Sequence, residues 1–428
     1  MMKPTAWWRN SSLPTLNLLK KKDHRRRNRK KALGDKVTTM KIALVSPYDF
    51  GYPGGVVNHI SCLEKSLTQM GHEVKIIAPA SKAVHTFGDR FIRIGTPRPV
   101  PGSGSIARIT LSPWLASRIK SVLAQEEFDI CHLHEPLMPM LCTTMLRLSN
   151  VPTVGTFHAS GGKPWYSFGT PLGKLLLKKW VNKLDAKIAV SSVARDYVKR
   201  HFPGEYIIIP NGIDTAHFNP DVTPIAELSD GKINIVFVGR MEKRKGLDYL
   251  LDAYKLVKNR VPDSRLIAVG PGVRLRKKYG RRISRNCLKD DVTFVGYASY
   301  TNLPRYYKTA DIVCSPATGR ESFGIVLLEA MAVSKPIVAS NIEGYASVLS
   351  HNSEGLLVPP RNVEELAEAM ITLISDKALR EKMGAEGRNK ALKYDWKRVA
   401  KMVEAVYLDV LNKGLPRGKS VETHATPV

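Results

Sequence analysis

The sequence has no long apolar run. No stretch approaches the ~18 uninterrupted apolar residues that a membrane-spanning helix needs, so we expect no membrane span. The amino terminus does not resemble a secretory signal, because Trp7 and Trp8 precede the Lys- and Arg-rich run at 20–31, whereas a signal places its charge before a longer apolar block. We therefore expect a cytoplasmic protein, and a peripheral position on the inner face of the cell membrane stays open.

Cysteine is scarce and dispersed. The five cysteines have no paired CxxC spacing, and they lie too far apart in the sequence for the usual zinc site or disulfide framework. We therefore expect reduced thiols that pack as small apolar side chains. The cysteines are Cys62, Cys131, Cys142, Cys287 and Cys314.

Acidic residues are few for a chain of this length. Sixty-six Lys and Arg against 38 Asp and Glu give a formal charge of +28. Residues 1–39 hold twelve basic and two acidic side chains, so they carry +10 and leave +18 on the rest. This excess favours an anionic partner, which can be phosphates, nucleic acid or an anionic lipid surface.

The remaining composition is that of a globular protein. The 428 residues are 43% apolar and 24% charged, and this length predicts two domains. We expect residues 1–39 to be a disordered basic extension, either an anchor or a consequence of the assigned start, with Met40 as the alternative start. Residues 414–428 are expected to be a disordered tail.

From Met40 onward, short apolar runs alternate with helical patterns, as in parallel α/β sheets. The pattern predicts one doubly wound domain at 40–214, a linker at 215–230 and a second such domain at 231–395. A helix at 396–413 has an apolar stripe that must pack somewhere, and a return to the first domain is one option. Two such domains leave a cleft at the carboxyl ends of their strands, where these sheets bind ligands.

Two loops that follow predicted strands are suited to phosphate. Gly54 and Gly55 precede a helix, so the backbone can approach a ligand and the helix offers free N–H groups, although a plain tight turn is an equal interpretation. Arg240 and Lys245 lie in the loop Gly239–Gly246, also before a helix. Two cations and a helix start make a diphosphate clamp, and the alternative is a solvated charge run.

Two carboxylates lie in the segment 319–331, which has a helical apolar pattern. Glu321 is expected at the helix start, where the dipole stabilises a carboxylate or where it acts as an ordinary cap. Glu329 lies in so apolar a stretch that its burial requires a partner, such as a ligand hydroxyl. On one helix the two would lie about 12 Å apart, which suits a nucleotide sugar and is too far for two-carboxylate hydrolysis.

Three histidines end two consecutive predicted strands. His132 and His134 end the first, and His158 ends the second. Histidines at strand ends in a cleft can bind metal or substrate, but a lone histidine is more often structural. We interpret His132 as structural, whereas His158 fits either role.

In combination, these motifs resemble glycosyltransferase family 4, whose members have the GT-B fold of two Rossmann-like domains facing a central cleft. The resemblance covers about residues 40–413. Within the family, several segments look like those of phosphatidylinositol mannosyltransferases. They are Ser-Pro-Tyr48-Asp-Phe, Leu-His-Glu-Pro136, Thr-Phe-His158, Ile-Pro-Asn-Gly212 and Tyr-Asp-Trp396.

This resemblance implies retaining transfer of mannose from GDP-mannose, with acceptor binding by the first domain and nucleotide-sugar binding by the second. The implied catalytic residues are His158, beside the sugar, and Glu321, on the sugar hydroxyls. The implied donor-binding residues are Gly55, Arg240 and Lys245 on the diphosphate, Glu329 on the ribose, Val295, Gly296 and Tyr297 at the base, and Gly324. The implied acceptor-binding residues are Tyr48, Arg108 and Lys163. No tightly bound cofactor or protein-held metal is expected, and Mg²⁺ accompanying the nucleotide-sugar stays open.

Several alternatives remain at the level of sequence. The acceptor is a lipid or a glycan, since Gly102 and Ser103 stand where the mannosyltransferases carry an aromatic residue and an amide. The Lys- and Leu-rich segment 171–184 can lie on an anionic bilayer or simply be a domain helix with a wet basic face. The donor can instead be a UDP-sugar. A nucleic-acid binder using residues 20–31 is the rival from another class, and no recognition motif supports it.

Overall fold

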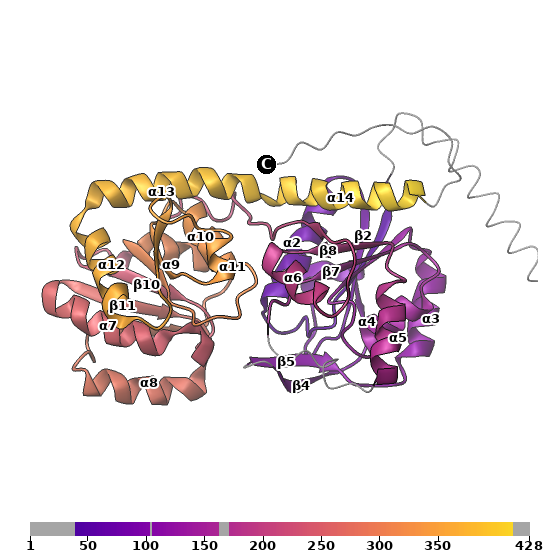
Figure 1. Ribbon diagram of the computed structural model, residues 1–428, viewed down its shortest axis with the longest axis horizontal. Helices are drawn as coiled ribbons and strands as arrows, with labels where there is room; N and C mark the ends of the chain where they lie inside the picture. The colour runs from indigo at the N-terminus through magenta and orange to yellow at the C-terminus, as the bar shows by residue number, and fades with distance from the viewer. Residues whose placement is uncertain (1–38, 103–104, 162–170, 414–428) are drawn as a thin grey trace, which may run out of the picture. The chain divides into compact units, whose positions relative to one another are not determined.

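The computed structural model contains two β-sheets of parallel strands, and it describes residues 39–102, 105–161 and 171–413 (Figure 1). The first sheet has seven strands in the order β3-β2-β1-β6-β7-β8-β9, and the second has six in the order β12-β11-β10-β13-β14-β15. All neighbouring strands in both sheets pair in parallel. The predicted extension up to residue 38, the tail 414–428 and Lys163 lie outside the described residues.

The first lobe contains the seven-stranded sheet and its helices. Its strands are β1 (Lys41–Val45), β2 (Glu73–Ala78), β3 (Phe91–Arg93), β6 (Ile130–His134), β7 (Thr153–Phe157), β8 (Ala186–Ala189) and β9 (Ile207–Ile208). Its helices are α2 (Gly55–Gln69), α3 (Leu115–Glu126), α4 (Leu141–Leu148), α5 (Pro171–Val181) and α6 (Ser192–Lys199). A separate antiparallel hairpin joins β4 (Pro97–Gly102) to β5 (Ser105–Thr110).

The second lobe contains the six-stranded sheet. Its strands are β10 (Ile233–Val238), β11 (Ser264–Val269), β12 (Val292–Gly296), β13 (Ile312–Ser315), β14 (Ile337–Ser340) and β15 (Gly355–Val358). Its helices are α7 (Leu247–Arg260), α8 (Val273–Arg285), α9 (Leu303–Thr309), α10 (Ile325–Ala332), α11 (Glu343–Ala346), α12 (Val363–Ser375) and α13 (Lys377–Ala391), and α7 packs beside α12 (Figure 1).

The central strands are apolar because helices cover both faces of each sheet. Ile42–Val45 of β1 and Asn234–Phe237 of β10 are buried without the alternation of a half-exposed strand. Two hydrophobic clusters fill the second lobe, and the apolar stripe of α7, which includes Leu250 and Tyr254, belongs to one of them. The predicted pair of doubly wound α/β sheets is confirmed.

The strand order places one switch point in each sheet. In the first sheet the chain runs outward from β1 in one direction through β2 and in the other through β6. The switch point of the first sheet thus lies between β1 and β6, and that of the second sheet lies between β10 and β13. Neighbouring loops diverge at such a point and leave a crevice at the carboxyl ends of the strands, where ligands bind.

The last helix, α14 (Trp396–Lys413), follows α13 and contacts α2 of the first lobe (Figure 1). Its stripe of Val399, Val403, Val406 and Val410 is buried. The side chains of Tyr407 and His132 form a 2.6 Å hydrogen bond. No helix of the described residues has both the length and the apolar character that crossing a bilayer demands.

Candidate functional site

A cavity of about 440 Å³ lies at the loops that follow the switch-point strands. Eight of the predicted site residues line it, namely Gly55, His158, Arg240, Lys245, Tyr297, Glu321, Gly324 and Glu329. Val295 and Gly296 belong to β12 and are not among the described residues that line this cavity. The predicted donor and sugar residues are therefore largely brought together.

The cationic loop after β10 owes its shape to Gly246. This residue has φ +76°, and an added Cβ would lie 1.8 Å from the carbonyl oxygen of Pro316, so no other side chain fits there without movement. A short 3₁₀ turn, η4 (Lys243–Lys245), precedes it, and α7 begins immediately afterwards. Arg244 and Lys245 of this turn and Arg240 just before it all line the cavity.

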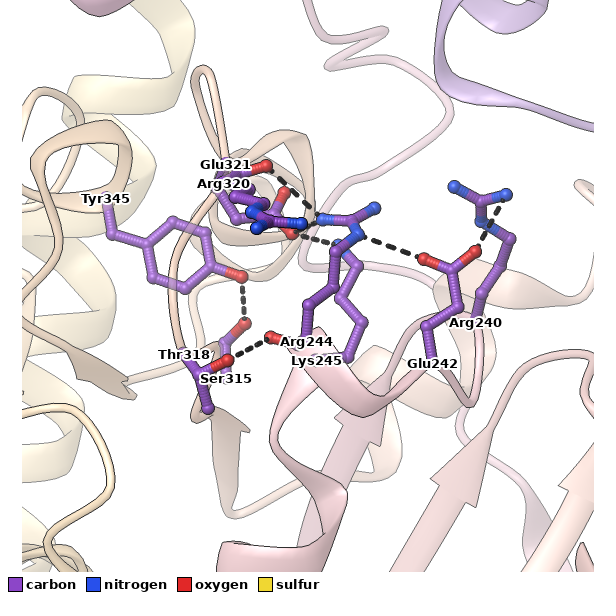
Figure 2. Close-up of polar contacts among 9 residues, drawn as sticks. All are labelled: Arg240, Glu242, Arg244, Lys245, Ser315, Thr318, Arg320, Glu321 and Tyr345. Carbon is purple, nitrogen blue, oxygen red and sulfur yellow. Dashed lines mark hydrogen bonds and ion pairs between the residues drawn. The ribbon is translucent and has the colours of Figure 1, made fainter. Parts of the chain in front are cut away.

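These cations meet two carboxylates (Figure 2). Glu242 accepts from Arg240 Nη1 at 3.0 Å and from Arg244 Nε at 3.0 Å. Glu321 accepts from Lys245 Nζ at 2.7 Å and also from Arg244 Nη1. The cations are therefore held in place by ion pairs and are not a solvated charge run.

Glu321 uses a single oxygen for both of its ion pairs. Lys245 and Arg244 both bind Oε1, and no described residue donates to Oε2. Burial alone would raise the pKa of the Glu321 carboxyl, but the charges of Lys245 and Arg244 outweigh burial and hold the pKa below its usual value. Glu321 is thus an oriented carboxylate with one oxygen left for a ligand.

The expectation that Glu321 starts a helix is wrong. Helix α10 begins at Ile325 after Gly324, which has φ +96°, so Glu321 lies in the preceding loop. An added Cβ on Gly324 would lie 2.7 Å from the ring of Tyr345, which explains why glycine turns the chain here. The helical rise therefore does not set the separation of the two glutamates, and the ion pairs hold Glu321 in place of a helix dipole.

Glu329 lies within α10 with an exposed fraction of 8%. Tyr307 of α9 donates a 2.6 Å hydrogen bond to its Oε2, so this buried carboxyl has a protein partner before any ligand binds. Burial raises the pKa of the Glu329 carboxyl to about 7, and the Tyr307 hydrogen bond and the charge of Lys245 oppose burial only in part. The side chain lines the cavity and is poised to change charge near neutral pH.

In the first lobe, Gly54 and Gly55 begin α2. A Cβ added at either position would meet no atom within 4 Å, so the backbone here is open to the cavity. Helix α2 has 15 residues and no side-chain cap at its N-terminus. Its first N–H groups are therefore suited to an anion.

The histidines come together beside this helix start. His59 of α2 and His158 after β7 line the cavity, and His134 Nδ1 lies 3.1 Å from His158 Nε2. Burial lowers the pKa of the His59 imidazole to about 4 and lowers those of His134 and His158 well below the usual value. His132 is fully buried, with its two ring nitrogens bonded to Tyr407 and Thr156.

Two of the predicted acceptor residues, Tyr48 and Arg108, lie together but outside the cavity. Tyr48 bridges to Ile109, and the backbone N–H of Asp49 donates to the carbonyl oxygen of Arg108 at 2.9 Å. The guanidinium of Arg108 lies 4.5 Å from the ring centre of Tyr52. Tyr48 and Arg108 are therefore neighbours on the side of the hairpin β4–β5.

The sequence interpretation missed three residues of this region. Arg244 lies between two cationic neighbours, and only the turn at η4 shows that it grips Glu321. Glu135 accepts from the backbone N–H groups of His158 and Ala159 at 2.7 and 2.8 Å, which holds the loop after β7. His59 lies inside α2, where the sequence interpretation did not name it. The signal for Glu135 was present, because it belongs to the quoted segment ending at Pro136.

Two family models match the chain in succession. Glycosyltransferase Family 4 matches residues 53–217, and Glycosyl transferases group 1 matches residues 221–390. The phosphatidyl-myo-inositol mannosyltransferase of Mycobacterium leprae is 35% identical over 380 residues, which cover 88% of this chain and 98% of that protein. The chain belongs to glycosyltransferase family 4. It is therefore an enzyme of the hexosyltransferase type.

Another relative and two solved structures support the same family and fold. The protein of the same name from Mycolicibacterium smegmatis is 34% identical over 383 residues, covering 88% of this chain and 95% of the relative. Among solved structures, sucrose-phosphate synthase of Thermosynechococcus elongatus has a TM-score of 0.71 at 22% identity, covering 87% of this chain and all of that one. Anabaena Alr3699/HepE in complex with UDP and glucose has a TM-score of 0.69 at 20% identity, covering 86% and 100%. The predicted GT-B fold is confirmed.

Proposed function

We propose that this glycosyltransferase transfers mannose from GDP-mannose to a phospholipid acceptor with retention of configuration, at a membrane surface. The observation that carries the proposal is the contact of Lys245 and Arg244 with Oε1 of Glu321. It brings a cationic loop suited to a diphosphate against a carboxylate suited to a sugar. The 35% identity to mannosyltransferases named for phosphatidyl-myo-inositol supports the choice of sugar and acceptor.

The leaving diphosphate needs positive groups that are already in place. Arg240 and Lys245 line the cavity, and the capless start of α2 at Gly55 offers N–H groups. Such fixed groups stabilise charge that develops on the departing phosphate without reorganising during the reaction. Together they would hold the diphosphate.

The sugar and ribose would bind to the two glutamates. The free Oε2 of Glu321 would accept from a sugar hydroxyl, and Glu329, deeper in α10, would accept from the ribose. The sugar carbon would then pass through an oxocarbenium-like state, with the leaving phosphate taking the acceptor's proton on the same face. His158, kept neutral by burial, would sit beside the transferred sugar.

The acceptor would approach from the side of Tyr48 and Arg108. Nearby in the sequence, the surface exposes Ile106 (59%), Leu111 (47%) and Trp114 (86%), followed by exposed Arg118 and Lys120 of α3. Apolar side chains beside cations are suited to an anionic lipid surface. On α5, exposed Leu175, Lys178 and Lys179 have the same character. Lys163, the third expected acceptor residue, lies outside the described residues.

We expect no tightly bound cofactor, and any Mg²⁺ would enter with the nucleotide-sugar. A thermal-shift screen against GDP, UDP and ADP tests the donor first, with GDP expected to stabilise most. Transfer from labelled GDP-mannose to liposomes containing phosphatidylinositol then tests the reaction. A preference for UDP would defeat the mannose assignment, and equal flotation with neutral and anionic liposomes would defeat the membrane claim.

A further inference from the structure

Three imidazoles from separate elements converge in the first lobe. His59 comes from α2, His134 from the end of β6 and His158 from the loop after β7. One ring nitrogen of each lies within 4.8 Å of the other two. The fold therefore brings together three histidines that are distant in the sequence. Hexose transfer, as proposed, uses only one of them, His158.

The hydrogen bonds around the cluster leave lone pairs directed inward. His59 Nδ1 lies 2.8 Å from Asn211 Oδ1, and an amide oxygen only accepts, so Nδ1 carries the proton and Nε2 keeps its lone pair. His134 Nδ1 and His158 Nε2 face each other at 3.1 Å and need only one proton between them. His134 Nε2 is buried without a hydrogen-bond partner among the described residues. The cluster therefore has more nitrogen atoms than its own hydrogen bonds satisfy.

The neighbours of the cluster hold the rings in place. The ring of His134 stacks on that of His132 at 4.4 Å, and His132 is itself fixed by Tyr407 and Thr156. The ring of Trp396 lies 4.9 Å from that of His59. An outer hydrogen bond such as that from His59 Nδ1 to Asn211 is also typical of metal-binding histidines.

The spacing suits a small divalent ion. Tetrahedral Zn²⁺ with bonds of about 2.0 Å to imidazole nitrogens places those nitrogens about 3.3 Å apart. The 3.1 Å distance between His134 Nδ1 and His158 Nε2 is already close to this value. Side-chain movements of about 1 Å would bring the His59 nitrogen to the same distance from them. Three nitrogen ligands and no carboxylate favour zinc and its neighbours over Mg²⁺ or Ca²⁺, which prefer oxygen.

We propose that His59, His134 and His158 bind one divalent transition-metal ion, best matched by Zn²⁺, whose fourth position opens to the cavity. Since His59 and His158 line the cavity, the bound ion would lie where the sugar has to sit. Zn²⁺ would therefore inhibit sugar transfer. The binding itself does not depend on which sugar or acceptor is used.

The test uses the full chain without an affinity tag, stripped of metal by a chelator. Titration with Co²⁺ is expected to give the visible absorption of a tetrahedral site. Competition with a chromophoric chelator is expected to show one tight equivalent of Zn²⁺. His134→Gln should remove the cobalt bands and weaken zinc binding at least about 100-fold, and Asn211→Ala, which frees His59, should weaken it about 10- to 100-fold.

A matched control is His85→Asn, an exposed histidine of the turn η1 (His85–Arg90), which should bind as the unchanged chain does. Circular dichroism checks that each variant is folded. Tight zinc binding that survives His134→Gln would place the ion on other histidines and overturn the proposal, as would the absence of tight binding to the unchanged chain. Full transfer activity with one equivalent of zinc bound would show that the ion does not occupy the position of the sugar in the cavity, and would overturn that part of the proposal.

Discussion

Replacing Glu329 by glutamine should stabilise the folded protein at neutral and alkaline pH. The side chain is buried in α10, and burial raises the pKa of its carboxyl from its usual value of 4.5 to about 7. The folded state therefore binds this proton more tightly than the unfolded chain does. Stability is highest while the group is protonated in both states, and it is lost as the pH rises from about 4.5 to about 7.

The size of the effect follows from the shift. Each pKa unit corresponds to about 1.4 kcal/mol, so the charged carboxylate costs about 3 kcal/mol of unfolding free energy above pH 7. Glutamine cannot ionise, and its carbonyl oxygen can still accept the 2.6 Å hydrogen bond from Tyr307. The variant should thus be more stable by under about 1 kcal/mol at pH 5 and by about 3 kcal/mol at pH 8.

Urea unfolding followed by circular dichroism at several pH values from 5 to 8.5 measures this difference. The matched control is Glu381→Gln, whose carboxylate on α13 is 69% exposed and should change the stability little at any pH. A difference that stays constant with pH would refute the titration of Glu329. A difference that shrinks as the pH rises would show that the carboxylate is stabilised in the fold, which is the opposite sign.

Three further predictions concern the same region. Donor affinity of the unchanged chain, measured by calorimetry, should rise from pH 6 to pH 8 as Glu329 ionises, and Glu329→Gln should remove this dependence; a flat profile for the unchanged chain would contradict the ribose assignment. Arg244→Ala should lower kcat by about 10-fold or more with little change in the donor KM, because Glu321 loses one of the two charge-assisted bonds that orient it. Arg244→Lys should recover part of that loss, and an equal loss in both variants would argue against a positioning role. Gly246→Ala should destabilise the fold by more than about 1 kcal/mol in urea, because its φ is +76° and its Cβ would strike Pro316, whereas Gly280→Ala, with no atom within 4 Å, should be neutral or stabilising; equal effects of the two would refute the steric account.

The sequence by itself determined the α/β architecture and named eight of the residues that line the cavity. Buried strands such as β1 and β10 contain apolar runs, at Ile42–Val45 and Ile235–Val238, and glycines such as Gly54 and Gly324 precede the helices whose starts face the cavity. These are local signals, so they can be identified without knowing what lies next to them. The order of loop and helix after each strand then indicated the edge of the sheet where ligands bind.

Only the tertiary structure decided which side chains pair. Arg244 forms an ion pair with Glu321, and Tyr307 donates a hydrogen bond to Glu329. The imidazole of His59 lies beside those of His134 and His158. Each of these groups contains residues from different elements. Spacing along the chain carries no information about such contacts, which is why Glu321 was wrongly expected at a helix start. Burial and pairing set the charges of these groups, and both arise only when the separate loops meet at the ends of the folded sheets.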